Sequence, residues 1–198
     1  MAALQKTHQK PHVYGVYTKS MLTKRVSLSI TQVGKNIKRN LENTISKSTE
    51  GRCIAEGFIK PNSVKVLTYS SGDISGDQIF FETVFECMIC HPVEGMLIEC
   101  TVKTITKAGI HAEVDETDGI VPLTIFVARD HQYNDRLFGA AKENTKVTVR
   151  VIGIRFELND PYICVIAKLV DNSAGEKQTH KKPITIDRGN LGSPLPPP

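Results

Sequence analysis

The chain has 198 residues, of which 40% are hydrophobic and 23% charged, and its formal net charge is +4. These values are ordinary for a globular protein and allow one large domain or two small ones. The apolar runs are far shorter than the about 20 residues that span a bilayer. The first residues, "MAALQKTHQKPH", contain no apolar core of a signal peptide. The composition therefore excludes a membrane-spanning protein and predicts no membrane partner.

The chain has five cysteines, an odd number, and four of them lie in strand-like apolar runs. This pattern favours reduced, buried thiols of a cytosolic or nuclear protein over a disulfide framework. Cys87 and Cys90 have a spacing found in zinc sites, but residues i and i+3 of a strand face opposite sides. A second pair with this spacing is absent from the sequence. We therefore expect core cysteines, no metal and no other cofactor.

Charge is distributed unevenly along the chain. Residues 1–50 carry nine Lys and Arg against two Glu, whereas residues 51–122 carry five against eleven acidic residues. A basic head and an acidic middle indicate two surfaces that meet different partners. For residues 1–20, a solvated basic arm is the alternative.

The first half reads as a mixture of strands and one helix. Residues 1–20 have no clear period and predict a flexible arm, whereas the alternation in 24–30 predicts a strand. Ile37, Leu41 and Ile45 are spaced by four and predict a helix over 36–48. Further strands are expected over 52–59, 63–69 and 78–92, and a polar loop over 70–77. The order predicts an α+β domain over residues 21–92.

After Pro92 the pattern changes to all-β. We expect strands at 96–105, 110–114, 120–123, 146–156 and 162–170, with an irregular segment between the third and the fourth. Five short strands in this arrangement predict an OB-fold barrel over residues 93–170. Residues 171–198 are polar and end in "GSPLPPP". They predict a disordered tail, with a polyproline ligand as the alternative.

Gly109 and His111 suggest a role for the barrel. A glycine at the entry of the second strand removes a Cβ that would oppose the bend of a closing sheet. Alternation places His111 on the outer face, where OB folds meet single-stranded nucleic acid. An imidazole can stack on a base, and Lys103 and Lys107 are near enough to attract phosphates. A solvated surface histidine is the alternative.

Catalytic patterns are missing from the sequence. Asp115, Glu116 and Asp118 cluster in one turn, but they lack the spacing of an EF-hand. We find no Ser/His/Asp or Cys/His set, P-loop or HExxH motif. The sequence therefore predicts no catalytic residue and a protein that is not itself an enzyme.

The back half resembles a known RNA-binding module. The segments "VEGMLIECTVKTITKAGIHAEV", "DGIVPL" and "TKVTVRVIGIRFELNDPYICVIAKL" are similar to the OB domain of the ribosomal S-one type. Gly95 precedes the first strand, Gly109 opens the second, and a valine-rich strand leads into the closing hairpin. The chain departs from the family at two positions. His111 stands where the family usually has Phe, and Pro122 stands where it often has His.

The front half resembles the stalk subunit of multisubunit RNA polymerases, the eukaryotic subunit-seven and archaeal subunit-E family. The stretch "VSLSITQVGKNIKRNLENTISKSTEGRC" shares its strand, its Gly-x-Asn step into an amphipathic helix and its Glu-Gly turn. The segment 76–102, "GDQIFFETVFECMICHPVEGMLIECTV", resembles the family's junction between its two parts. The resemblance covers about residues 24–170.

The resemblance implies a non-catalytic polymerase subunit. Its N-terminal domain is expected to dock near the clamp on the core, formed by the largest subunits, and a small helical stalk partner to complete a heterodimer. The OB domain is expected to lie near the RNA exit path and to bind nascent RNA weakly, without sequence preference and with salt sensitivity. The candidate docking residues are Lys35, Lys38 and Arg39; the candidate RNA-binding residues are Lys103, Lys107 and His111, with Arg150 and Arg155 as secondary choices.

Two alternatives stay open. One is a free-standing OB-fold RNA-binding protein of translation or RNA decay, and the other is a scaffold whose barrel has lost RNA binding. A stalk subunit is expected in the nucleus, or in the cytoplasm or virion if a large DNA virus encodes it. The polymerase class and the organism are not readable from the sequence.

Overall fold

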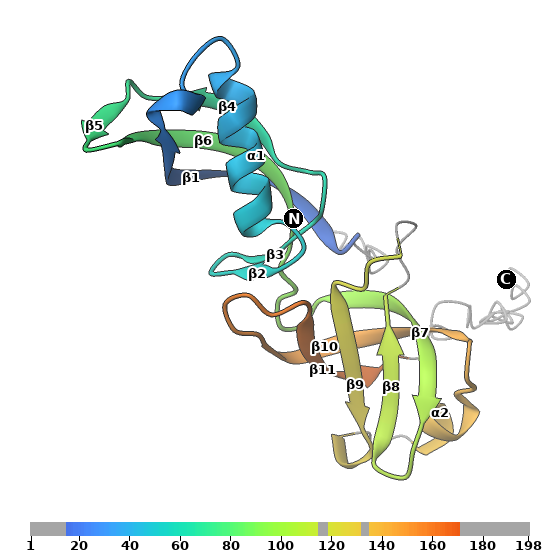
Figure 1. Ribbon diagram of the computed structural model, residues 1–198. Helices are drawn as coiled ribbons and strands as arrows, with labels where there is room; N and C mark the ends of the chain where they lie inside the picture. Colours follow the sequence, from blue (N-terminus) through green and yellow to red (C-terminus); the bar gives the residue numbers. More distant parts are fainter. Residues whose placement is uncertain (1–14, 115–118, 132–134, 171–198) are drawn as a thin grey trace, which may run out of the picture.

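The computed structural model describes residues 15–114, 119–131 and 135–170, and these are mostly β-structure (Figure 1). A six-stranded sheet comes first and a closed five-stranded barrel second. The sheet is built from β1 (Tyr17–Ser29), β2 (Cys53–Ile54), β3 (Gly57–Ile59), β4 (Lys65–Tyr69), β5 (Asp73–Ser75) and β6 (Gln78–Cys90), and the barrel from β7 (Leu97–Ile105), β8 (Gly109–Glu113), β9 (Leu123–Ala128), β10 (Lys146–Arg155) and β11 (Ile163–Leu169). The described helical segments are α1 (Ile37–Thr49), α2 (Asp135–Ala140) and the 3-10 turns η1 (Ile30–Gln32) and η2 (Arg129–His131).

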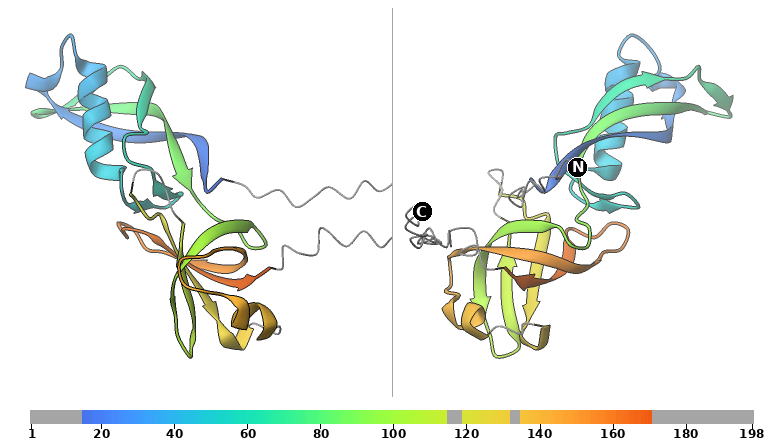
Figure 2. Two further views of the ribbon diagram at one scale, coloured as in Figure 1. Left: turned by 90° about the vertical axis from the view of Figure 1, so that its right-hand side faces the viewer. Right: turned by 180° about the vertical axis from the view of Figure 1, so that it is seen from behind.

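The sheet is organised around its central strand, β6. On one side β6 pairs with β1 over the full length of both strands, and on the other side with β3, β4 and β5. Helix α1 lies against one face of this sheet (Figure 2). Leu41 and Ile45 of its apolar stripe are fully buried, which confirms the helix predicted from their spacing. Phe81, Phe85 and Cys87 of β6 are buried on the same side.

Several boundaries in the front half differ from the predictions. Strand β1 begins at Tyr17, inside the predicted arm, and β5 lies inside the predicted loop. The predicted strand 52–59 is a hairpin of β2 and β3 instead, because Gly57 has φ +131°. A Cβ at Gly57 would lie 2.5 Å from the carbonyl oxygen of Cys90, so the chain turns where only glycine fits. A separate α+β domain over 21–92 stays a prediction.

The barrel predicted for the back half is confirmed as an OB-like closed barrel. Its strand order is β7, β8, β9, β11, β10, and β10 pairs with β7 to close the ring. All pairings are antiparallel except that of β9 with β11. The inward side chains alternate along each strand and are buried: Ile98, Cys100, Val102, Ile110, Ala112, Ile125, Val127, Val149, Val151, Ile163, Val165 and Ala167.

The third barrel strand was predicted in the wrong place. It was expected over 120–123, but β9 begins at Leu123 and continues through the segment that was predicted to be irregular. The period of two continues through Leu123, Ile125 and Val127, all of which are fully buried. The rest of that segment contains the 3-10 turn η2 and the short helix α2. The carboxylates of the turn 115–118, the arm 1–14 and the tail 171–198 lie outside the described residues.

The boundary predicted between residues 92 and 93 stays a prediction. The hydrophobic core of the barrel includes residues from both sides of it. Cys53, Phe58 and Cys90 belong to the sheet in sequence but pack in the core of the barrel.

Across the described parts of the chain, no helix is long and apolar enough to cross a membrane.

Candidate nucleic-acid interface

A row of one histidine and two apolar side chains lies on the outer face of the barrel. In the antiparallel pair β8–β9, His111 lies opposite Phe126, and in the parallel pair β9–β11, Phe126 lies opposite Ile166. Residues opposite each other project from the same face of a sheet. Phe126 is 37% exposed, Ile166 is 46% exposed and His111 is half-buried. We call these three residues the platform.

The backing of the platform is rigid. The neighbours of Phe126 along its strand, Ile125 and Val127, are fully buried, as are Ile110 and Ala112 on either side of His111. The inward residues are therefore held by core packing, which orients the outward ones. An exposed aromatic ring beside an imidazole, both backed by buried neighbours, is a surface on which bases can stack.

Gly109 serves the platform in a way that differs from the prediction. A Cβ at this position would lie 2.6 Å from the ring of Phe126 and 2.5 Å from the carbonyl oxygen of Val127. The φ of Gly109 is not in the left-handed region, so the glycine is explained by close approach rather than by backbone conformation. The ring of Phe126 lies where the side chain of residue 109 would otherwise be.

The turn that precedes Gly109 is tied to the end of β9. The hydroxyl oxygen of Thr106 accepts a hydrogen bond from the backbone N–H of Gly109 at 3.2 Å. The backbone N–H of Thr106 donates to the carbonyl oxygen of Gly109 at 2.9 Å. The N–H of Arg129 donates to the carbonyl of Ala108 at 3.1 Å. These bonds place the exposed Lys107 and Arg129 at the same end of the barrel. Arg129 also lies 4.7 Å above the ring of Phe138.

The other predicted cations surround the platform rather than lie on it. Lys103 sits in a bulge of β7, and its ammonium is 4.0 Å from the carboxylate of Glu113. Arg150 is exposed and lies opposite Lys168 of β11. Arg155 makes a 3.5 Å ion pair with Glu157, and both side chains are largely exposed. Their contact with RNA stays a prediction.

Sequence reasoning missed Phe126, Ile166, Lys168 and Arg129. A signal for Phe126 was present, because Leu123, Ile125 and Val127 alternate and Phe126 therefore faces outward. The pairing of β9 with β11 is parallel and joins segments about 40 residues apart, as Phe126 and Ile166 show. The sequence alone does not reveal it.

A second group of predicted residues lies at the end of the sheet farthest from the barrel (Figure 1). Lys35, Lys38 and Arg39 surround a shallow hollow of about 300 Å³ at the first turn of α1, together with Asn36 and Glu42. The carboxylate of Glu42 accepts the N–H of Val66 at 3.0 Å, which ties this turn to β4. Nearby, the backbone N–H of Ile30 donates a hydrogen bond to the carbonyl oxygen of Asp77 at 3.3 Å. Ile30 and Ile74 are 58% and 74% exposed.

The face of the sheet opposite α1 carries apolar and charged side chains together, since Met21 lies opposite Glu86 and Arg25 lies opposite Glu82. Met21 is 69% exposed, and Thr23 lies opposite the half-buried Val84. An ion pair of 2.8 Å between Lys19 and Glu86 borders this face. In the described chain β1 pairs only with β6, so its other edge is open.

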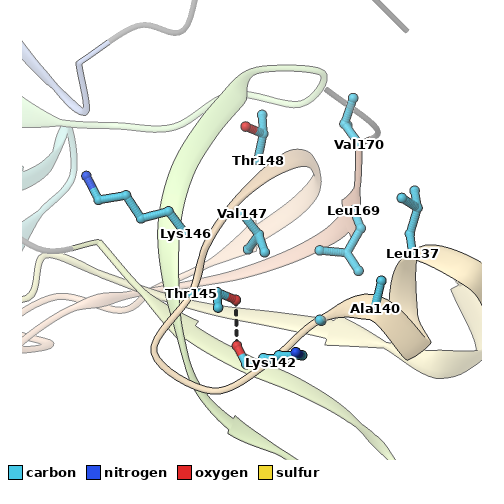
Figure 3. A pocket seen from close by; sticks show the side chains of 10 residues that line it. Leu137, Ala140, Lys142, Thr145, Lys146, Val147, Thr148, Leu169 and Val170 are labelled. Atoms are coloured by element: carbon cyan, nitrogen blue, oxygen red, sulfur yellow. Dashed lines mark hydrogen bonds between the residues drawn. The ribbon is translucent and has the colours of Figure 1, made fainter. Parts of the chain in front are cut away.

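Another hollow, of about 330 Å³, lies between α2 and the ends of β10 and β11 (Figure 3). Its wall is mostly apolar, with Leu137, Val147 and Leu169 (Figure 3). The hydroxyl of Thr145 at its rim donates to the carbonyl of Lys142 at 2.6 Å. Its lining contains no carboxylate, histidine or cysteine, and its charged members are Lys142 and Lys146.

The cysteines do not form a metal site in the described chain. Cys87 is buried in the core of the sheet and Cys90 in the core of the barrel, so the two thiols point into different clusters. Burial raises the pKa of both Cys53 and Cys87 to about 11, with smaller contributions from Asp160 at Cys53 and Glu56 at Cys87. Among the described residues, no three His, Cys, Asp or Glu side chains are placed to hold a metal ion.

Two known proteins are similar to this chain. A putative DNA-directed RNA polymerase subunit of Acanthamoeba polyphaga mimivirus is 26% identical over 173 residues, covering 82% of this chain and 86% of that protein. DNA-directed RNA polymerase II subunit 7 of Arabidopsis thaliana is 24% identical over 153 residues, covering 69% and 84%. These relatives support an RNA polymerase subunit family. No family model matches the chain.

Proposed function

We propose that the chain is a non-catalytic stalk subunit of a DNA-directed RNA polymerase. The observation that carries this proposal is the extent of the two similarities, which cover 82% and 69% of the chain. Neither the sheet nor the barrel alone is long enough to account for those shares. Both parts are therefore shared with proteins named as polymerase subunits.

Docking on the polymerase core is assigned to the far end of the sheet. Lys35, Lys38 and Arg39 supply positive charge there, and Ile30 and Ile74 supply exposed apolar surface. Apolar anchors surrounded by charged residues are typical of protein interfaces. An acidic surface of a large subunit near the clamp fits this end.

The small helical partner is assigned to the face of the sheet opposite α1. An exposed methionine in a partly apolar face beside an open strand edge is a surface that a protein partner would cover. The charged pair Lys19–Glu86 at its border would set the register of the partner. The resulting heterodimer leaves the platform on the barrel accessible.

Nascent RNA is assigned to the platform. Stacking on aromatic side chains contributes about 1–3 kcal/mol per base and is tolerant of sequence. Phosphate contacts are assigned to Lys107 and Arg129 at one end of the barrel, and to Lys168, which is exposed two residues after Ile166 on β11. With few cations the binding is weak, and each phosphate contact makes it sensitive to salt.

The relatives come from a giant virus and a plant, which is consistent with a nuclear protein or one of a cytoplasmic viral factory.

The test is purification of the tagged full chain from its source at near-physiological salt, followed by mass spectrometry. The two largest polymerase subunits and one small helical protein are expected to co-purify. Recovery of ribosomal or RNA-decay proteins, or of RNA alone, would instead support a free-standing RNA-binding protein.

A charge reversal sharpens this test. Lys38→Glu with Arg39→Glu is expected to reduce recovery of the large subunits at least about tenfold, because unlike charges across an interface become like charges. The matched control, Lys142→Glu with Lys146→Glu, reverses two exposed cations of the barrel and is expected to leave recovery unchanged. Equal recovery with both double variants would remove Lys38 and Arg39 from the docking surface.

A further inference from the structure

A row of side chains from the sheet enters the core of the barrel. Cys53 of β2 lies opposite Phe58 of β3, and Phe58 lies opposite Cys90 of β6. Cys90 in turn lies opposite Tyr17 of β1. Cys53, Phe58 and Cys90 are at most 1% exposed, and all four residues pack with the barrel's buried residues rather than with the core under α1. We call them the junction row.

The neighbouring residues of the same strands face the other way. Ile59 and Ile89 lie opposite each other and are buried in the core of the sheet, and Ile54 packs against that core. The strands β2, β3 and β6 therefore contribute alternate residues to both hydrophobic cores. Neither core can be separated from the other without exposing a complete face of this small hairpin to water.

A backbone clasp joins the same hairpin to the barrel. The N–H of Cys53 donates to the carbonyl of Asp160 at 2.8 Å, and the N–H of Asn159 donates to the carbonyl of Cys53 at 2.8 Å. Asp160 and Asn159 belong to the loop between β10 and β11, which reaches up to β2 (Figure 1). These two bonds make the loop an additional strand-like partner of β2.

The loop is held in the shape that the clasp needs. The backbone of Asn159 adopts the left-handed conformation, with φ +70°. The carboxylate of Asp160 accepts the N–H of Glu157 at 2.7 Å, and the N–H of Asp160 donates to the carbonyl of Glu157 at 3.2 Å. Just before the loop, the ring of Phe156 contacts His91 edge to face, with 6.0 Å between centroids.

From these contacts we propose that the sheet and the barrel open and unfold as one cooperative unit, with the junction row as a shared core and the clasp as its cover. A chain of two independent domains joined by a linker would open first at this junction. The proposal does not depend on the proposed function. If that function also holds, the platform keeps a set orientation relative to whatever the far end of the sheet binds.

The cysteines of the chain provide the readout. Cys53 and Cys90 lie in the junction row, Cys87 in the sheet core, Cys100 in the barrel core, and Cys164 is exposed. A buried thiol reacts with a maleimide only after opening, because it is inaccessible and little of it is thiolate. The raised pKa values of Cys53 and Cys87 strengthen this protection. The labelling rate of each thiol thus measures the population of the opened state that exposes it.

The experiment labels the native full chain with N-ethylmaleimide and reads each cysteine by tandem mass spectrometry. Cys164 is expected to label at least about a thousandfold faster than the four buried thiols, as suits a folded domain of ordinary stability. After correction for intrinsic thiol reactivity, Cys53 and Cys90 are expected to label at the rate of Cys87 and Cys100. Labelling of Cys53 and Cys90 more than about tenfold faster than the other two would overturn the proposal.

A variant of the clasp tests whether these hydrogen bonds keep the junction closed. Asp160→Ala removes the acceptor that shapes the loop and is expected to speed labelling of Cys53 and Cys90 about tenfold relative to Cys87 and Cys100. Leu158→Ala, at a 68% exposed position of the same loop, is the matched control and is expected to change none of the four rates. Unchanged labelling of all four thiols in Asp160→Ala would show that the clasp does not hold the junction closed, and would overturn that part of the proposal.

Discussion

The barrel and the sheet solve the problem of strand edges differently. In the barrel, β10 pairs with β7, so every strand has a neighbour on both sides. In the sheet, the 13-residue strand β1 pairs on one side only within the described chain. A closed barrel hides its backbone groups, whereas an open edge presents them to a partner.

The two parts also differ in what they leave exposed. The barrel buries its inward side completely and presents a narrow row, the platform, with cations around it. The sheet covers one face with α1 and leaves Met21 exposed on the other. This difference is the basis on which the proposed function assigns RNA to the barrel and protein partners to the sheet. Four predictions test that division.

The largest effects are expected in the two cores. Ile125→Ala in the barrel and Leu41→Ala under α1 each remove a fully buried side chain and are expected to lower the free energy of unfolding by about 2–5 kcal/mol. Urea denaturation followed by fluorescence or circular dichroism measures the loss. Both variants are expected to move one common transition. Two separate transitions would mean that the parts unfold independently.

A smaller loss of stability is expected at Gly109. Gly109→Ala places a Cβ against the ring of Phe126 and the carbonyl of Val127, and overpacking of this kind costs about 1–3 kcal/mol. Displacement of the ring is also expected to weaken RNA binding. Gly153→Ala in β10 is the control, since a Cβ there meets no atom within 4 Å. Equal stability of both variants would show that the close approach at Gly109 is not strained.

The division of labour is tested by one substitution in each part. Phe126→Ala is expected to weaken binding of a single-stranded RNA by about fivefold to a hundredfold, from the loss of one stacking contact. Met21→Asp is expected to leave that affinity unchanged and to reduce recovery of the small partner. Fluorescence anisotropy and co-purification provide the two readouts. An RNA affinity that falls equally in both variants would contradict the assignment of RNA to the barrel.

The smallest effect is expected at His111. His111→Phe enlarges the flat surface of the platform and is expected to strengthen RNA binding a few-fold, whereas His111→Ala weakens it by at most a few-fold. Filter binding at fixed pH and salt measures both changes. If Phe at this position has no effect on affinity, His111 does not contact RNA.

Much of the fold is readable from local periodicity. The spacing of Ile37, Leu41 and Ile45 predicts α1, and the alternation in β6 predicts which of its side chains are buried. These patterns work because a helix and a strand each repeat with a period set by their own backbone. The errors fall where a single residue changes the local geometry, as Gly57 does in splitting a predicted strand into β2 and β3.

The candidate site is less readable, because its parts come from distant segments. Alternation places His111 and Phe126 on an outer face, but only the pairing of β9 with β8 and β11 makes them neighbours of Ile166. The bulge in β7 moves Lys103 away from the row opposite His111, where Thr104 lies instead. A bulge of one residue reverses the facing of a side chain, and no local pattern announces it.

Local patterns in the sequence are sufficient for α1 and for most of the long strands, since burial of apolar side chains imposes the periods of two and 3.6 on each segment. Which segments share a core follows from the way the elements pack in three dimensions. The junction row combines Cys53, Phe58, Cys90 and Tyr17 from four strands and places them in a barrel that begins after them in the chain. Such contacts depend on how separate elements pack in space. The hydrophobic effect is non-directional, so an apolar side chain does not specify which other segment will bury it.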